Sequence, residues 1–311
     1  MQSQSTFHAH GKLLLTAEYL VLDGAAAIAL PCRYGQNMSV SKSSSQGRVV
    51  LCRSLDERGK EWFAGQFDMD KPSVLSTTDE AVAERFLSIL IYLAKHNKEA
   101  FSSDTKWEFV HQINFSRYWG LGTSSTLIYN MATWAEVNPY GLAEHVFGGS
   151  GYDIACAGAS GPLRYKINSP LPRYEEIDFN PIFKDNIYFV YLEQKQNSRE
   201  GIKNYRALQN ENKKPHAIAE VEELNDNILG ARSLSDFEES IREHESIISN
   251  IIGMPKVQDV HFADLDGVAK SLGAWGGDFA MLTSHGGYEA LKKYCQTKGF
   301  GTVIPYQQMI L

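Results

Sequence analysis

The chain has few cysteines and no long apolar run, and both absences exclude classes of protein. Its 311 residues include four cysteines, which form no C-x-x-C pair and lie far apart: Cys32, Cys52, Cys156 and Cys295. This spacing excludes a disulfide framework or a cysteine zinc site and indicates buried thiols in a reducing compartment. The longest apolar windows, such as residues 89–94, fall far short of the roughly 20 residues that span a bilayer. Residues 1–6 are polar, so we expect no secretory signal, no membrane association and a cytoplasmic protein.

The chain also lacks an excess of basic residues. Its formal net charge is −7 and its sequence pI is about 5.7, which argues against a dedicated nucleic-acid binder. A nucleotide substrate is still compatible with this balance, because a local pocket can be positive on an acidic protein. No solenoid-length repeat or low-complexity tract occurs in the sequence. The content of 43% hydrophobic and 22% charged residues is typical of a soluble globular protein with one large or two moderate domains.

Apolar patterns predict strands mixed with helices rather than a regular βαβ alternation, and this mixture indicates an α+β fold. Strands are expected over residues 7–22, 25–30, 38–40, 48–52, 107–115, 187–192, 279–282 and 302–306. Helices are expected over residues 78–96, from the glycine loop at residues 120–126 to near 138–141, through residues 154–157, and over residues 198–209, 217–231, 235–252, 262–272 and 286–297. The segment Asn168–Pro172 interrupts the pattern, so we predict an N-terminal domain over residues 1–170 and a C-terminal domain over residues 171–311.

The most informative segment is Gly-Leu-Gly-Thr-Ser-Ser-Thr at residues 120–126, which leads into an apolar helical stretch. Its glycines let a phosphate approach the backbone, and the helix N-terminus and hydroxyl groups favour an anion or its magnesium. The segment is not a Walker loop, because no Gly-Lys-Ser/Thr follows at the required spacing. Ser125 occupies the third glycine position of a dinucleotide fingerprint and so excludes that motif as well. By itself, such a loop is more often an ordinary helix cap.

Three further segments accompany this loop in order along the chain. Residues 11–18 read Gly-Lys-Leu-Leu-Leu-Thr-Ala-Glu, residues 150–153 read Ser-Gly-Tyr-Asp, and residues 273–278 read Gly-Ala-Trp-Gly-Gly-Asp. The four segments resemble the motifs of the GHMP kinases, which include galactokinase, homoserine kinase, mevalonate kinase and phosphomevalonate kinase. The resemblance covers nearly the whole chain by motif order. The first segment and the Glu-Tyr-Leu-Val-Leu stretch at its end look most like the mevalonate and phosphomevalonate kinases.

The resemblance implies a two-domain GHMP-kinase-like fold, an N-terminal α+β domain against a C-terminal ferredoxin-like domain with the active site between them. It implies an enzyme that uses ATP and Mg²⁺ to phosphorylate a small-molecule alcohol or phosphate acceptor. The implied ATP-binding loop consists of Gly120, Leu121, Gly122, Thr123, Ser124 and Ser125.

The same resemblance assigns catalytic and metal-binding roles. Asp153 falls on the family's acidic residue beside the acceptor hydroxyl, and Lys12 falls on the motif-one lysine near that aspartate and the phosphates. Ser124 is an implied magnesium ligand. The mevalonate branch also holds magnesium with a glutamate upstream of the Ser-Gly-x-Asp segment. Glu144 is the nearest candidate for that glutamate, although its spacing does not match cleanly.

Each of these residues also has a simpler explanation. An isolated Lys12 would be a solvated strand residue, and Asp153 could cap the helix that follows it. His8 and His10 would share one side of a strand, but no third metal ligand accompanies them. The functional interpretation is favoured because four independent segments follow one family's order.

The chain departs from the family pattern mainly where the acceptor is recognised. His10 and Ala17 stand where proline and glycine are usual, and Trp275 interrupts the third glycine segment. The expected acceptor is mevalonate or phosphomevalonate. Alternatives are a kinase of another small alcohol, a diphosphomevalonate decarboxylase-like enzyme, or a catalytically silent sensor that binds nucleotide and metabolite. The oligomeric state is open, with a homodimer as one option.

Overall fold

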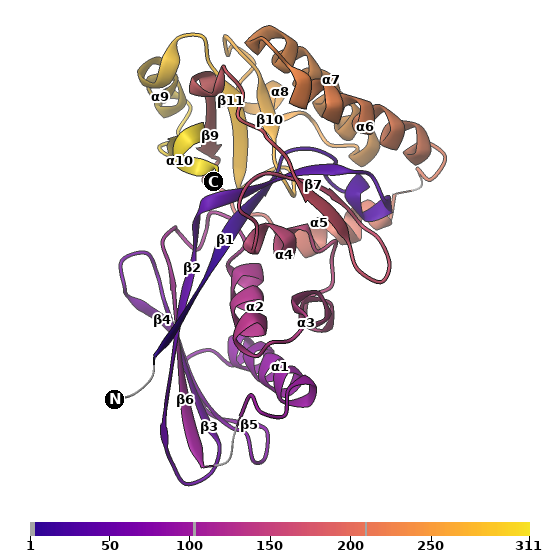
Figure 1. The fold of residues 1–311 in the computed structure, drawn as a ribbon. Coiled ribbons are helices and arrows are strands. Elements are labelled where there is room, and N and C mark those ends of the chain that lie inside the picture. The colour runs from indigo at the N-terminus through magenta and orange to yellow at the C-terminus, as the bar shows by residue number, and fades with distance from the viewer. Residues whose placement is uncertain (1–3, 102–103, 209) are drawn as a thin grey trace. The chain divides into compact units, whose positions relative to one another are not determined.

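The computed structural model describes residues 4–101, 104–208 and 210–311 and mixes strands with helices (Figure 1), which confirms the predicted α+β class. The strands are β1 (Ser5–Leu14), β2 (Ala27–Ser44), β3 (Val49–Leu55), β4 (Glu61–Asp68), β5 (Ser73–Thr77), β6 (Thr105–Ile113), β7 (Leu163–Lys166), β8 (Arg173–Glu176), β9 (Ile187–Tyr191), β10 (Ala269–Ser271), β11 (Phe279–Thr283) and β12 (Val303–Pro305). The helices are α1 (Glu80–His96), α2 (Thr123–Trp134), α3 (Pro139–Val146), α4 (Tyr152–Ala157), α5 (Ser198–Arg206), α6 (Lys214–Gly230), α7 (Leu234–Ile252), α8 (Val257–His261), α9 (Gly287–Thr297) and α10 (Tyr306–Met309).

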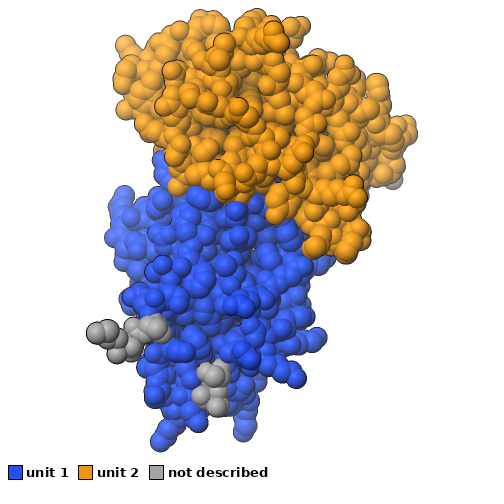
Figure 2. All heavy atoms as spheres, in the orientation of Figure 1, with its two compact units in different colours: residues 1–11, 34–117, 121–158 blue, residues 12–33, 118–120, 159–311 orange. Residues whose placement is uncertain are grey.

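The chain divides into two compact units, each built from separate stretches of sequence (Figure 2). Unit 1 contains residues 1–11, 34–117 and 121–158, and unit 2 contains residues 12–33, 118–120 and 159–311. These units do not correspond to a single division of the chain at residue 170, because residues 12–33 and 118–120 belong to the same unit as the C-terminal half. The domain assignment made from sequence stays a prediction.

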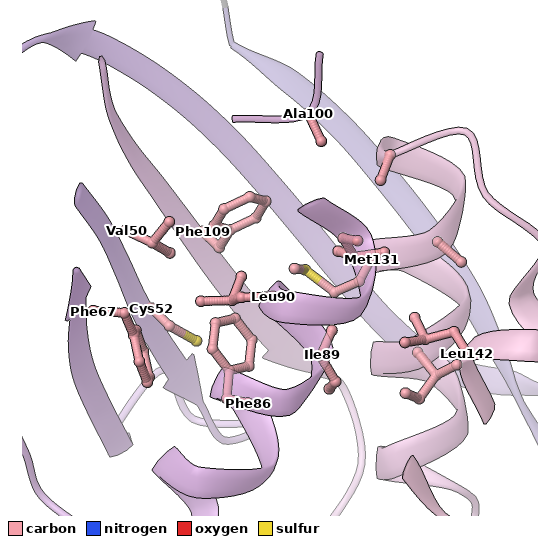
Figure 3. Packing of buried hydrophobic residues seen from close by; sticks show 14 of the residues in the cluster. Val50, Cys52, Phe67, Phe86, Ile89, Leu90, Ala100, Phe109, Met131 and Leu142 are labelled. Atoms are coloured by element: carbon pink, nitrogen blue, oxygen red, sulfur yellow. The ribbon is translucent and has the colours of Figure 1, made fainter. Parts of the chain in front are cut away.

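Unit 1 is a twisted sheet covered by helices. Its strands follow the order β5-β4-β3-β6-β2, with β3 and β6 parallel and the other pairs antiparallel. Helix α1 begins where the Asp79 side chain accepts a hydrogen bond from the Val82 N–H, 3.1 Å away. Its apolar face, including Phe86 and Leu90, packs on sheet residues such as Phe109 (Figure 3). The same core includes Ile128, Met131 and Ala132 of α2 and so fixes the helix that follows the glycine loop.

Unit 2 contains a second sheet of four antiparallel strands in the order β10-β11-β9-β12. Along the chain, β9 is followed by helices that include α6 and α7. Strands β10 and β11 come next, and α9 then leads to β12. This is the split βαββαβ arrangement of a ferredoxin-like fold, as expected from the resemblance. Strands β9 and β11 are buried along their whole length.

Several predicted elements need correction. The helix predicted over residues 262–272 is wrong, because Asp266 and Gly267 lie in a turn and Ala269–Ser271 then forms β10. Strands β4 and β5 were not predicted. The residues of β5 are largely exposed, whereas β4 has the alternation of a strand, with Phe63 and Phe67 buried, and the prediction overlooked it. Helix α5 ends at Arg206, and the predicted end at Gln209 lies outside the described residues.

Two negative predictions can be compared with the structure. All four cysteines are free and buried, as expected for isolated thiols. None of the helices in the described part of the chain is both long and apolar enough to cross a membrane.

Candidate active site

The glycine loop turns directly into a helix, as predicted. Gly120 and Gly122 have φ values of 66° and 95°, which glycine adopts without the strain that other residues incur. Gly122 is the N-cap of α2 and has no side chain to cap it, so the N–H groups of the first turn can donate to a bound anion. Ser124 is exposed at this end of the helix, whereas the buried Ser125 donates its hydroxyl to the Gly122 carbonyl, 2.9 Å away.

Lys12 contacts the entrance of the loop within unit 2. Its Nζ donates a hydrogen bond of 2.8 Å to the carbonyl oxygen of Gly120. The carboxyl group of Asp278 lies against the same glycine, since a Cβ added to Gly120 would be 2.3 Å from the Asp278 Cγ. Asp278 is not among the residues to which the resemblance assigns a role, although its place at the end of the third glycine segment could have indicated one.

Asp153 and Glu144 belong to unit 1, where α3 and α4 both pack against α2. Asp153 lies in the first turn of α4, and its Oδ1 accepts a hydrogen bond of 3.0 Å from the Ile154 N–H. The N-cap of α4 is Gly151, and no side chain makes a cap hydrogen bond there, so Asp153 does not cap the helix as the simpler explanation expects. Glu144 is exposed on α3. The aromatic residue before the loop, Trp119, packs edge-on against Phe279, with 5.6 Å between the ring centroids.

Glu18, at the end of the first segment, belongs to a buried network of charged groups in unit 2. The Nζ of Lys270 lies 2.5 Å from one oxygen of Glu18 and 3.4 Å from a carboxylate oxygen of Glu245. All three side chains are at most 2% exposed. Glu245 also accepts hydrogen bonds from the N–H and the hydroxyl of Ser271. Two carboxylates thus share one ammonium group in the interior, where an unpaired charge is costly.

This network holds a strained backbone turn. Ala17 and Tyr19, which flank Glu18, have φ values of 60° and 63°, and each such residue costs about 1–2 kcal/mol. The Ala17 N–H donates to Nε2 of His244 at 2.9 Å. Burial and the nearby Lys270 lower the pKa of His244 well below 6.5, so the ring is neutral and can accept this bond. The usual glycine at position 17 in the family is explained by this left-handed conformation.

We expect the network to make stability depend on pH through Glu18. Burial raises the pKa of Glu18 from 4.5 to about 7, against the opposing effect of Lys270. A raised carboxyl pKa gives stability that is present below pH 4.5 and is lost as pH rises through about 7. Glu18→Gln lacks this titration. Between pH 5 and pH 8, the free energy of unfolding of the variant should therefore rise by up to about 3 kcal/mol relative to that of the wild type. Denaturant unfolding at several pH values measures this, and parallel pH profiles would contradict it.

A cavity of about 340 Å³ lies beside the same turn in unit 2. The hydroxyl of Tyr19 donates to the Ala274 carbonyl oxygen at 2.9 Å and so joins the first and third motifs at its wall. The polar residues around it come mainly from α5 and its N-cap and include Asn197, Glu200 and Asn204. Trp275, which is 1% exposed, forms part of the wall and also fills the core. Among the described lining residues there is neither lysine nor arginine.

Several solved structures are similar to this chain over nearly its whole length. Methanococcus jannaschii mevalonate kinase superposes with a TM-score of 0.70 and 15% identity, with 97% of each chain covered. Lactococcus lactis galactokinase in complex with galactose has a TM-score of 0.71 and 13% identity, over 99% of this chain and 94% of its own. Streptococcus pneumoniae phosphomevalonate kinase in complex with phosphomevalonate and AMPPNP has a TM-score of 0.67 and 15% identity, over 95% of this chain and 97% of its own.

Sequence comparison adds no closer relative. No protein-family model matches the chain, and no curated protein matches it significantly by sequence. The structural likeness nevertheless extends over nearly the full length of both partners, and it includes the ferredoxin-like sheet of unit 2. The chain therefore has the fold of the GHMP kinase superfamily.

Proposed function

We propose that the chain is an ATP- and Mg²⁺-dependent kinase of the GHMP type that phosphorylates a small-molecule acceptor. The observation that carries this proposal is the 2.8 Å hydrogen bond from the Lys12 ammonium to the Gly120 carbonyl oxygen. It brings a positive charge to the entrance of a glycine loop that continues into a helix N-terminus. Such an arrangement suits the triphosphate of a nucleotide. The similar solved proteins are named for mevalonate, phosphomevalonate and galactose as small-molecule substrates or ligands.

In this proposal, the loop residues bind the ATP phosphates. The protein forms no covalent bond to the substrate in this scheme and acts by positioning the reactants. Backbone N–H groups of residues 120–125 and the hydroxyls of Thr123 and Ser124 donate to phosphate oxygens. The buried Ser125 supports the loop through its bond to Gly122. Positioning and charge neutralisation then account for most of the rate enhancement, because the transition state of phosphoryl transfer is loose.

Asp153 and Lys12 act on the acceptor and the transferred group. The acceptor hydroxyl oxygen forms a bond to the γ-phosphorus while the bond from that phosphorus to the β–γ bridging oxygen breaks, and ADP leaves. Asp153 orients the hydroxyl and accepts its proton late, when bond formation has made the alcohol more acidic. The Lys12 ammonium neutralises charge that develops on the phosphoryl oxygens.

Magnesium would neutralise the β- and γ-phosphates when bound. We propose Ser124 and Glu144 as ligands, since a hydroxyl and a carboxylate are hard oxygen donors that suit this ion. In residues 4–101, 104–208 and 210–311, no group of three histidine, cysteine, aspartate or glutamate side chains is placed to hold a metal ion. The nucleotide phosphates would therefore have to complete the coordination, as is usual for Mg²⁺.

The best candidates for the acceptor are mevalonate and phosphomevalonate, which are both anionic. The cavity beside Tyr19 supports a second candidate, a kinase of a neutral small alcohol. Amide and hydroxyl groups line this cavity together with the carboxylate of Glu200, and the described lining residues provide no cation for a carboxylate or phosphate. Such a lining suits hydroxyl groups better than an anion.

ADP release tests the proposal. Purified protein would be mixed with Mg-ATP and, one at a time, with mevalonate, phosphomevalonate, diphosphomevalonate, homoserine and several sugars. We expect acceptor-dependent ADP release with one class of acceptor. Nucleotide-dependent thermal stabilisation without turnover across an extended panel would contradict the kinase and favour a sensor. Absence of nucleotide binding would exclude both functions.

A further inference from the structure

Asp278 is a carboxylate placed at the entrance of the glycine loop, and the roles assigned so far do not use it. It lies within unit 2, directly before β11, and is half-buried. Its Cγ and Oδ2 would each be 2.3 Å from a Cβ on Gly120, so the carboxyl group occupies the space where any other residue would have a side chain. The absence of a side chain at Gly120 is therefore required by Asp278 as well as by the positive φ.

The backbone around Asp278 is held in a strained conformation. Its φ is 53°, in the left-handed region that non-glycine residues seldom adopt. Two short backbone hydrogen bonds fix it, from the Asp278 N–H to the Gln194 carbonyl oxygen at 2.6 Å and from the Leu192 N–H to the Asp278 carbonyl oxygen at 2.8 Å. The Gln196 N–H donates to Oδ1 at 3.2 Å and orients the carboxyl group. Strain that the surroundings maintain in this way is typical of functional positions.

The charges around Asp278 are those expected beside a nucleotide. Burial raises the pKa of Asp278 above its usual value, against the opposing effects of Lys12, which contacts the same glycine, and of Lys195. A carboxylate beside a lysine that is placed for phosphates can bind a cation that those phosphates share. If Asp278 served only to neutralise the charge of Lys12, it would not need a strained backbone that places its carboxylate against Gly120.

We propose that Asp278 is a ligand of the divalent cation that accompanies ATP. The inference rests on the proposed function, because the nucleotide phosphates supply the remaining ligands. Asp278 would then be a carboxylate ligand that the sequence did not indicate, and this role would explain why an aspartate ends the third glycine segment.

The test uses metal-dependent nucleotide binding and needs no turnover. The dissociation constant of AMPPNP is measured by calorimetry with Mn²⁺ and again with EDTA, and the ratio of the two constants gives the coupling between metal and nucleotide. Asp278→Asn removes the charge but keeps an oxygen acceptor for the Gln196 N–H, and asparagine tolerates the positive φ. Asp278→Gly removes the carboxyl group without any backbone strain. Asp266→Asn, at an exposed position of the same unit, is the matched control.

We expect Mn²⁺ to strengthen AMPPNP binding to the wild type and to the control, and both Asp278 variants to lose about tenfold or more of that gain. Their binding with EDTA should be unchanged. A wild-type coupling retained in both variants would overturn the proposal and leave the kinase assignment intact. The Asp278 proposal would also be overturned, and the kinase assignment left intact, if Mn²⁺ did not strengthen AMPPNP binding to the wild type. If the wild type binds no AMPPNP under either condition, the proposed function fails, and the Asp278 proposal fails with it.

Discussion

Asp153→Asn should lower the acceptor-dependent turnover by about 10²–10⁴-fold while leaving ATP binding nearly unchanged. The reason is that asparagine cannot accept the proton of the acceptor hydroxyl. The substitution preserves the structural contact of this residue, because the side-chain oxygen of asparagine can still accept the hydrogen bond from the Ile154 N–H. Steady-state ADP release and AMPPNP titration measure the two effects separately.

Asp79→Asn is the matched control for this variant. Asp79 belongs to the same unit and caps α1 through a hydrogen bond from the Val82 N–H, and asparagine is an equally good N-cap. We expect the control to retain wild-type turnover. Full turnover in Asp153→Asn would remove Asp153 from the mechanism, and equal losses in both variants would indicate a general effect of the substitutions on folding.

Lys270→Met should destabilise unit 2 by about 3–5 kcal/mol, because breaking a buried ion pair leaves an uncompensated charge. The Lys270 side chain is 0% exposed, and its loss would leave Glu18 and Glu245 facing one another without a cation. Without Lys270, which lowers the pKa of Glu18 against the effect of burial, Glu18 would take up a proton more readily, so the penalty should be smaller at acidic pH than at neutral pH. Denaturant unfolding at pH 5 and pH 7 measures both effects.

Lys298→Met tests the same substitution at the surface of unit 2. Lys298 lies 2.8 Å from Asp264, a distance similar to that in the buried pair, but the two side chains are 31% and 65% exposed. Exposed ion pairs contribute little to stability because solvent and salt screen them, so this variant should unfold almost like the wild type. Equal destabilisation by the two substitutions would show that burial does not determine the contribution of Lys270.

The parts of the site that were predictable from sequence are those in which a short segment determines its own conformation. The glycines at positions 120 and 122 were predicted to form a turn before a helix, and their positive φ values agree with that prediction. The four-stranded sheet of unit 2 and its strand order also agree with the resemblance. Glycine turns and apolar periodicity are local signals, so one sequence is enough to detect them.

Contacts between distant segments could not be predicted in this way. Lys270 pairs with Glu18 across 252 positions, and nothing in either segment indicates the other. The segment around Lys270 was interpreted as a helix because its apolar residues fit a helical period, whereas tertiary pairing with β11 makes it a strand. The sequence did not indicate Asp278 either, because its position against Gly120 is a contact between distant segments that forms only when unit 2 folds.

The most direct test of the account follows the γ-phosphate of ATP. Protein is incubated with magnesium and ATP labelled in the γ-phosphoryl group, together with the acceptor identified by ADP release, and the labelled products are separated. The account predicts that label moves to the organic acceptor, one equivalent for each ADP, and that Asp153→Asn abolishes this transfer. Label released only as inorganic phosphate, or retained in bound ATP, would contradict the assignment of this chain as a small-molecule kinase.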